Sequence, residues 1–278
     1  MRWPREALSG ERIGIWTIGL LAIAVAVLVG FAGTPFAAPE GTVERAAAAP
    51  GVEVTASHGG YAMQPTDADP ETGVVFYPGA RVDPSAYVPL LAPVVDRAEV
   101  AIVVPQPRLN LAVLEPNLAS AVLADDPGIE RWYVGGHSLG GAMACRYAAS
   151  NPDAVDGVVL FGAYCDRSIA DTDLRVLAVG GTRDTVLGTD RGALRPDTLP
   201  PTATIHRIEG ANHTSFGSYA GQRGDSPATI SRDAAHAALR ELLVDFLRNQ
   251  SSSPISSASR SWSRDLTSGS ISAIGSPS

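Results

Sequence analysis

Residues 131–149 read RWYVGGHSLGGAMACRYAA and decide how the whole chain is interpreted. An apolar strand pattern ends near Val134, and a helical pattern follows Ser138. Between them GHSLG, residues 136–140, matches G-x-S-x-G, which places a serine on a sharp strand-to-helix turn with its hydroxyl exposed. A plain glycine-rich turn or a phosphate-binding turn is the alternative, but the G-x-G-x-x-G spacing is absent. We therefore predict Ser138 as a nucleophile.

Outward from this turn, short apolar runs alternate with amphipathic stretches. Strands are predicted over 52–57, 74–77, 100–104, 131–135, 157–162, 175–180 and 203–209, and helices over 86–95, 111–123, 139–149 and 233–248. Several strands are continuous β-branched runs, typical of strands that are covered on both faces. The last helix has Ser231 as its predicted N-cap. This order predicts an α/β fold with a mostly parallel, doubly wound sheet.

A serine nucleophile needs a base and an orienting acid, which follow the serine along the chain in folds of this kind. Asp184 is the best candidate acid, because it follows the predicted strand 175–180 in GGTRDTV and would lie at the carboxyl edge of the sheet. Asp166, Asp171 and Asp173 lie one strand earlier and are weaker alternatives. A turn-forming aspartate without a catalytic role is the simpler explanation that the structure must exclude.

Five histidines compete for the role of base. His213, in EGANHTSFG, follows the last predicted strand and precedes the final helix, so it alone has both the chain order and the edge position required. Of the other four, His137 lies within the turn, and His58 comes before the sheet core. His206 lies within a predicted strand, and His236 lies on the last predicted helix. For the oxyanion hole we predict the backbone N–H groups of Leu139 and of Ala80, with Gly79 as the alternative to Ala80.

These motifs together resemble the α/β-hydrolase superfamily. GGHSLGG, FYPGARVDPSAY, GTRDTV and IEGANHTSFGSYAGQRGDSPATISR resemble a compact group of dienelactone-hydrolase-like serine hydrolases, over roughly residues 72–248. The resemblance implies Ser138 as nucleophile, Asp184 as acid and His213 as base. One departure is NHTSFG, where the group would have an Ala-Gln pair between the histidine and the phenylalanine. The segment Phe216–Asp225 belongs to the same pattern, but the sequence assigns it no role.

The N-terminal residues predict a membrane anchor. No charge occurs from Ile13 to Ala38, whereas Arg2, Arg5 and Arg12 precede this run. Such a run can cross a bilayer, and the positive-inside rule places Met1 in the cytoplasm and the catalytic domain outside the cell membrane. A cleaved signal peptide, which would make the protein secreted, and a buried core helix are the alternatives.

The predicted organisation has five parts. They are a cytoplasmic N-terminus (1–12), a transmembrane anchor (13–36), a linker (37–51), the α/β-hydrolase domain (52–249) and a disordered serine-rich tail (250–278). The segment between the strands 157–162 and 175–180 is too short for a helical lid, which predicts a minimal fold without a cap domain. The resulting open cleft would be bordered by Arg81, Tyr87, Tyr164 and the loop 185–202, and would suit small or exposed esters.

Composition narrows the chemistry further. The chain has 278 residues, with 21 Lys+Arg against 29 Asp+Glu and a net charge of −8, so nucleic acid is not an expected partner. All basic residues are arginine, which excludes a P-loop lysine, a lysine Schiff base and a Ser-x-x-Lys site. No cluster has metal-ligand spacing, so we expect neither a metal nor a cofactor. Cys145 and Cys165, the only cysteines, are predicted to be two separate buried thiols, although pairing stays possible.

The sequence thus predicts a membrane-anchored serine hydrolase that forms an acyl-enzyme with ester-type substrates, namely carboxylesters, thioesters or lactones. An acyltransferase would use the same triad, and the triad alone cannot separate the two. A non-catalytic binding module on the same fold is the alternative from another class. Neither the substrate nor the oligomeric state can be predicted from these residues.

Overall fold

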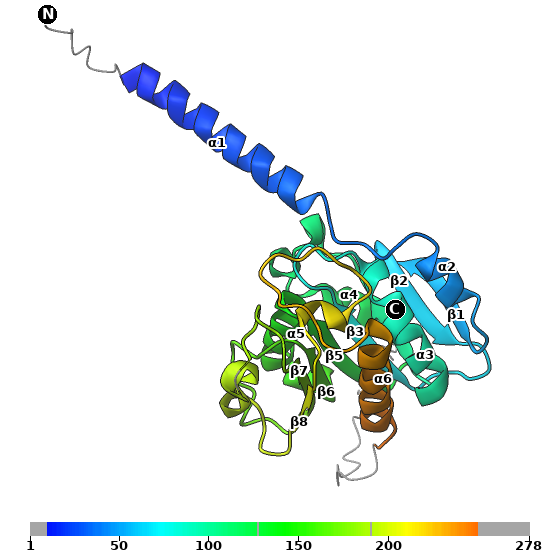
Figure 1. The fold of residues 1–278 in the computed structure, drawn as a ribbon. Coiled ribbons are helices and arrows are strands. Elements are labelled where there is room, and N and C mark those ends of the chain that lie inside the picture. Colours follow the sequence, from blue (N-terminus) through cyan, green and yellow to red (C-terminus); the bar gives the residue numbers. More distant parts are fainter. Residues whose placement is uncertain (1–9, 127, 190, 250–278) are drawn as a thin grey trace, which may run out of the picture. The chain divides into compact units, whose positions relative to one another are not determined.

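Eight strands form one sheet within residues 10–126, 128–189 and 191–249, which are the residues that the computed structural model describes (Figure 1). The strands are β1 Val52–Ser57, β2 Gly60–Pro65, β3 Thr72–Tyr77, β4 Ala101–Val104, β5 Arg131–His137, β6 Gly157–Phe161, β7 Arg175–Gly181 and β8 Thr204–Ile208. Their order across the sheet is β1-β2-β4-β3-β5-β6-β7-β8. The predicted serine-rich tail 250–278 and residues 1–9 lie outside the described residues.

The six consecutive strands β4-β3-β5-β6-β7-β8 pair parallel with one another, while β2 pairs antiparallel with both β1 and β4. The mostly parallel sheet is therefore confirmed. All seven predicted strands form, each with ends within two residues of the predicted range. Strands β3 and β5 to β7 are buried along nearly their whole length, which is why they are continuous apolar runs in the sequence.

Strand β2 is absent from the sequence prediction. It forms a hairpin with β1 across His58 and Gly59, which both have positive φ angles, 49° and 74°. Such a pair of φ angles is typical of the tight turns that join antiparallel strands. Only Gly60 and Met63 of this strand are buried, so the sequence GYAMQP shows no regular alternation that would identify it.

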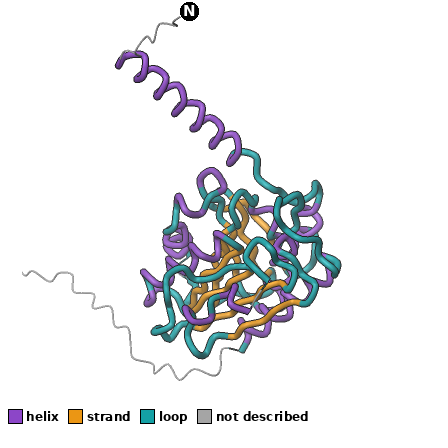
Figure 2. Tube along the Cα trace, turned by 60° about the vertical axis from the view of Figure 1, so that its left-hand side comes forward, coloured by secondary structure: helices purple, strands orange, loops and turns teal. Residues whose placement is uncertain are grey.

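Helices cover both faces of the sheet, as a doubly wound fold requires. α3 (Val88–Ala98) and α6 (Arg232–Arg248) pack on one face, and α4 (Leu118–Asp125) and α5 (Leu139–Ser150) pack on the other. Figure 2 shows the strands enclosed by these helices and by the connecting loops. The predicted N-cap of the last helix is confirmed, because the Ser231 hydroxyl accepts a hydrogen bond from the Ala234 N–H at 3.1 Å.

The predicted helix over 111–123 begins later than expected. Its first residues form a short 3-10 turn, Ala112–Leu114, which follows another such turn at Arg108–Asn110, and α4 begins only at Leu118. Pro116 accounts for this difference, because the residue before a proline is disfavoured in the α-helical region. The apolar positions alone did not reveal this break.

The N-terminal region differs from the prediction. A helix, α1 (Gly10–Ala32), forms over most of the predicted anchor. Within the described part of the chain, however, no helix has both the length and the apolar character needed to cross a bilayer. The transmembrane span predicted over 13–36 is therefore not supported.

The residues after α1 pack against the α/β domain. Phe36 forms an isolated parallel bridge with Val82, through hydrogen bonds from its N–H to the Arg81 carbonyl and from the Asp83 N–H to its own carbonyl. Its ring lies 5.7 Å from that of Tyr219. A short helix, α2 (Thr42–Ala47), follows inside the segment that the sequence indicated as a linker. Val43 and Ala46 of this helix are partly buried and pack against the core, so part of this segment belongs to the folded domain.

Candidate active site

Ser138 is the residue between β5 and α5. It is half-buried and has φ 55° and ψ −125°, a conformation that is costly for a residue with a side chain. The turn is tight because two glycines allow it. A Cβ atom on Gly136 would lie 2.6 Å from the Tyr77 carbonyl oxygen, and one on Gly140 would collide with the same oxygen. The predicted strand–serine–helix turn is therefore present, with the Ser138 N–H bonded to the Phe161 carbonyl at 3.0 Å.

Asp184 and His213 form a buried pair at the same edge of the sheet. Asp184 follows β7 and His213 follows β8, and each side chain is only 1% exposed. Oδ2 of Asp184 lies 2.8 Å from Nδ1 of His213. The other carboxylate oxygen, Oδ1, accepts hydrogen bonds from the N–H groups of Val186 and Leu187 at 3.0 and 2.8 Å. Both oxygens are thus engaged, which fixes the carboxylate and orients the imidazole.

The remaining ring nitrogen of His213, Nε2, is buried and has no hydrogen-bond partner within the described structure. The Ser138 hydroxyl does not bond to it in this conformation. A buried ring nitrogen without a partner is costly, and in unliganded enzymes the bond between base and nucleophile is often long. The structure thus brings Asp184 and His213 together directly. It places Ser138 at the same sheet edge without a hydrogen bond to His213.

His137, the residue before Ser138, packs against the ring of His213 but is not itself a candidate base. Its ring centroid is 4.5 Å from that of His213, and its Nδ1 lies 3.0 Å from the hydroxyl of Tyr87. Burial, together with the nearby charge of His213, lowers the pKa of His137 well below its usual value. His137 is therefore a neutral, buried ring that packs behind the candidate base.

The backbone N–H groups predicted for the oxyanion hole differ in whether they already make a hydrogen bond. The N–H of Gly79 donates to the hydroxyl of Tyr87 at 2.9 Å, so it is already used. The N–H of Ala80 makes no hydrogen bond within the described residues, and Ala80 is exposed. Leu139 is the first residue of α5, and the first N–H groups of a helix lack helical partners. The geometry favours Ala80 over Gly79 as the second donor.

The alternative acids and bases lie elsewhere. Asp166 forms an ion pair with Arg146, while Asp171 and Asp173 are exposed. Nε2 of His58 lies 3.4 Å from a carboxylate oxygen of Asp125, an exposed partner on α4. His206 is exposed on β8, and His236 is buried on α6. Among these residues only Asp184 and His213 form a buried carboxylate–imidazole pair.

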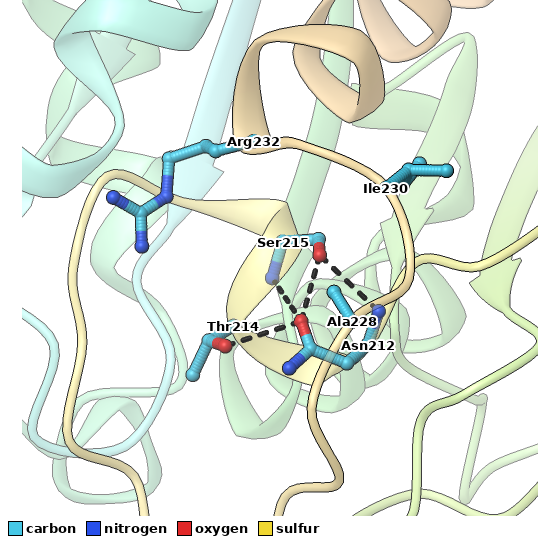
Figure 3. A pocket seen from close by; sticks show the side chains of 6 residues that line it. All are labelled: Asn212, Thr214, Ser215, Ala228, Ile230 and Arg232. Atoms are coloured by element: carbon cyan, nitrogen blue, oxygen red, sulfur yellow. Dashed lines mark hydrogen bonds between the residues drawn. The ribbon is translucent and has the colours of Figure 1, made fainter.

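A small pocket lies between the loop that carries His213 and the residues that lead into α6 (Figure 3). The pocket has a volume of about 220 Å³ and is lined by Asn212, Thr214, Ser215, Ala228, Ile230 and Arg232 (Figure 3). The Asn212 side chain oxygen accepts hydrogen bonds from the Ser215 N–H, the Ser215 hydroxyl and the Thr214 hydroxyl. These bonds cap the 3-10 turn His213–Phe216 and stabilise the backbone on which the imidazole is mounted.

The prediction of two separate thiols is wrong. Cys145 of α5 and Cys165, just after β6, form a disulfide, with Cα atoms 5.3 Å apart and a sequence separation of 20. The physical reason is that α5 packs beside the end of β6, which brings the two side chains together. Sequence spacing alone does not show which residues of a helix and a loop meet.

The segment between β6 and β7 confirms the expectation of a short connection. Residues 162–174 contain no helix, so this part of the chain builds no lid over the sheet edge. Tyr164 is 36% exposed there, with the Arg195 guanidinium 5.9 Å from the centroid of its ring. Within the described residues, no group of three or more His, Cys, Asp or Glu side chains could hold a metal ion.

The sequence did not predict two residues that support the loops of the candidate site. Asp225 lies in the segment to which the sequence assigned no role, and its carboxylate accepts hydrogen bonds from the backbone of the His213 loop. Phe36 lies in the predicted anchor and bonds to the loop that carries Ala80. The GDS motif at 224–226 is a turn pattern that could have indicated Asp225. No local signal indicated Phe36.

These features define a class of proteins: α/β folds with a strained serine between a strand and a helix, and a buried Asp–His pair at the same sheet edge. The model of the alpha/beta hydrolase family matches residues 73–237. The chain belongs to the alpha/beta hydrolase family, and the resemblance found in its motifs is confirmed. No curated protein matches the sequence.

Several solved structures have a similar fold. A predicted CIB-like hydrolase from Thermoplasma acidophilum has 17% identity and a TM-score of 0.52, covering 72% of this chain and 99% of its own. An esterase from Pyrobaculum calidifontis has 14% identity and a TM-score of 0.50, covering 89% and 94%. A bacterial membrane phospholipase A has 14% identity and a TM-score of 0.52, covering 86% and 99%. At such identities the likeness shows the fold.

Proposed function

We propose that this protein is a serine hydrolase that cleaves ester-type bonds of small-molecule substrates through an acyl-enzyme. The observation that carries the proposal is the buried Asp184–His213 pair, in which Nε2 of His213 has no hydrogen-bond partner and lies at the sheet edge that also carries Ser138, half-buried on a strained turn. A serine hydroxyl is a weak nucleophile until a base takes its proton, and an imidazole oriented by a carboxylate is such a base.

In the proposed first half-reaction, the Ser138 oxygen attacks the carbonyl carbon of the ester, and its proton passes to Nε2 of His213. The negative charge on the carbonyl oxygen is stabilised by the N–H groups of Leu139 and Ala80. The tetrahedral intermediate then expels the alcohol, which takes the proton from His213. Asp184 stabilises the imidazolium through its hydrogen bond to Nδ1.

In the second half-reaction, water replaces the alcohol. His213 takes a proton from the water as it attacks the acyl carbon, and the acid leaves as Ser138 recovers its proton. An esterase and a phospholipase among the solved structures with this fold support an ester bond as the target. The absence of a helix in residues 162–174 supports small or exposed esters, because no lid in that segment encloses a long acyl chain.

The direct test measures hydrolysis of p-nitrophenyl acetate and p-nitrophenyl palmitate by the full chain, by Ser138→Ala and by Ser168→Ala. Ser168 lies on the exposed loop after β6 and serves as the matched control. Wild type and Ser168→Ala should hydrolyse the acetate, whereas Ser138→Ala should lose at least about 1000-fold in kcat. Activity that survives in Ser138→Ala would refute the proposal, and a preference for palmitate would refute the open cleft.

We also propose that the catalytic domain works outside the reducing cytoplasm. The Cys145–Cys165 disulfide supports this location, because stable disulfides are rare in cytosolic proteins and common in oxidising compartments. The check is to block free thiols during cell lysis and to measure the mass of the purified protein. Two blocked cysteines in the protein from its native host would contradict the proposed location.

A further inference from the structure

The segment Gly224–Ser226, which we call the bridging segment, contacts both loops that carry the Asp–His pair. Along the chain it follows the turn His213–Phe216 and precedes α6. It does not touch the reacting nitrogen of His213. Its hydrogen bonds instead go to the backbone and side chains beside His213 and beside Asp184. The sequence motif that contains it had no assigned role.

On the side of the base, the Asp225 carboxylate accepts three hydrogen bonds. The N–H of His213 donates to Oδ1 at 3.1 Å, and the N–H of Thr214 donates to Oδ2 at 2.8 Å. The hydroxyl of Thr214 donates to the same Oδ2 at 3.0 Å. These N–H groups begin a 3-10 turn and lack partners within it, and an ionised carboxylate is a strong acceptor for them. The position of the His213 Cα is thereby tied to Asp225.

On the side of the acid, Thr185 is the residue next to Asp184, and its hydroxyl bonds to the bridging segment. It donates to the Gly224 carbonyl at 2.8 Å and accepts from the Ser226 N–H at 2.8 Å. The Ser226 carbonyl in turn accepts a hydrogen bond from the Asn212 side chain at 2.7 Å, which returns to the base loop. A single short segment therefore connects the residue after the acid with the residues around the base.

We propose that Asp225 and Thr185 are positioning residues, which hold the Asp184 and His213 loops at the separation that their 2.8 Å hydrogen bond requires. This inference rests on the proposed function. Thr185 is exposed and Asp225 is half-buried, so neither contributes a large part of the hydrophobic core. Their loss is expected to alter the placement of the imidazole more than the stability of the fold, and small misplacements reduce catalysis strongly.

The experiment uses the full chain with Asp225→Ala, Asp225→Asn, Thr185→Val and Thr185→Ser, with Asp171→Asn as a matched control on another exposed loop. Active sites are titrated, so that kcat refers to folded protein. Asp225→Ala and Thr185→Val should each lower kcat about 10- to 100-fold, with KM within about threefold of wild type. Thr185→Ser keeps the hydroxyl and should restore kcat, and Asp225→Asn should fall between Asp225→Ala and wild type.

A second readout does not depend on activity. Hydrogen exchange of the backbone amides of His213 and Thr214 should become at least about tenfold faster in Asp225→Ala and unchanged in Asp171→Asn. If the wild type is inactive on esters while exchange rises in the variant, the proposed function fails and the positioning contacts stand. If the wild type is active and the variants keep both its kcat and its exchange rates, the positioning inference is overturned.

Discussion

Tyr87 shows how one hydroxyl can join two parts of the candidate site. It accepts a hydrogen bond from the Gly79 N–H and lies 3.0 Å from Nδ1 of His137, whose ring packs against His213. Burial raises the pKa of Tyr87, so the hydroxyl stays protonated and offers a hydrogen bond to Nδ1 of His137. The loop with Ala80 and the turn with Ser138 are thereby held in a fixed relation.

Replacing this hydroxyl should affect catalysis and stability together. Tyr87→Phe leaves a buried N–H and a buried ring nitrogen without partners, which costs about 1–3 kcal/mol and should lower kcat about tenfold. Tyr77→Phe is the matched control, because its hydroxyl also accepts from a backbone N–H, that of Ala119, on the helix α4 side. Urea unfolding and ester kinetics are measured on both. An equal loss of kcat in Tyr77→Phe would contradict the role of Tyr87.

His236 on α6 makes the fold sensitive to acid. Burial, together with the charges of Arg240 and Arg232, lowers the pKa of its imidazole to about 4. In the unfolded chain this imidazole takes up a proton near pH 6.5, whereas in the folded protein it does so only near pH 4. The contribution of His236 to the free energy of unfolding is therefore at its full value above pH 6.5. It is lost as pH falls from 6.5 to 4, because the proton binds to the unfolded chain first. The loss amounts to about 3 kcal/mol.

Measurements of unfolding free energy at pH 7.5 and pH 4.5 check this prediction. Wild type should lose stability between the two, and His236→Gln should lose about 2–3 kcal/mol less over the same interval. His206, which is exposed, provides the control variant His206→Gln. If the free energies of unfolding of wild type and His236→Gln fall by the same amount between pH 7.5 and pH 4.5, His236 does not titrate as a buried neutral group.

At the residue scale the sequence predicted the Asp184–His213 pair, which the structure contains, and missed the residues that hold the two loops in place. The order of Ser138, Asp184 and His213 along the chain was enough to select them, because carboxyl ends of parallel strands meet at one edge. The contacts of Asp225 and Tyr87 depend on where loops fold back. No periodicity or spacing expresses that, so these contacts could not be found without coordinates, although the GDS turn pattern at 224–226 marks Asp225 itself.

Among the secondary structure elements, α5 is held beside the sheet at two points, its N-terminus and its middle. Its N-terminus follows Ser138, and Cys145, about two turns later, is bonded to Cys165 after β6. Both cysteines are fully buried. A disulfide that closes a loop of this length stabilises the fold mainly by restricting the unfolded chain.

The double variant Cys145→Ala/Cys165→Ala should therefore lose about 3 kcal/mol of unfolding free energy. Thermal unfolding of the wild type with and without reductant should show the same direction. Catalysis should fall by no more than about threefold, because glycine packing and the Ser138 N–H bond still hold the turn. Identical melting with and without reductant would show that the bond is absent in solution.

The strands also show where sequence prediction succeeds. Strands β3 and β5 to β7 are buried on both faces and form continuous apolar runs, which the sequence identified to within two residues. Strand β2 lies toward the antiparallel edge with only Gly60 and Met63 buried, and it was missed. A strand that is buried on both faces has a continuous apolar sequence, whereas a strand with few buried residues has no such pattern. This explains why β3 and β5 to β7 were predicted and β2 was not.

For the molecule as a whole, the predicted division between anchor, linker and catalytic domain is too simple. Phe36 packs against Tyr219 and the Arg81 guanidinium, whose central carbon lies 5.0 Å from the centroid of its ring, and it bonds to the backbone beside Ala80. Residues far from the nucleophile in sequence thus support the predicted oxyanion loop. Conformational order in this loop matters because its N–H must stay in place during the reaction.

Phe36→Ala in the full chain should lower kcat/KM several-fold and stability by about 1–3 kcal/mol. Val43→Ala, which removes another half-buried side chain from the same core face, should cost less than about 1.5 kcal/mol and leave kcat/KM unchanged. Steady-state kinetics and chemical unfolding measure both. Equal catalytic losses in the two variants would mean that Phe36 acts only through global stability.

The central claim is that Ser138, His213 and Asp184 act as one nucleophilic unit. Its most direct test is the rate at which a fluorophosphonate modifies the protein, with the modified residue located by peptide mass spectrometry. The account predicts labelling of Ser138 alone, with rates at least about 100-fold lower in His213→Gln and reduced in Asp184→Asn. Labelling of another residue, or an undiminished rate in His213→Gln, would contradict it.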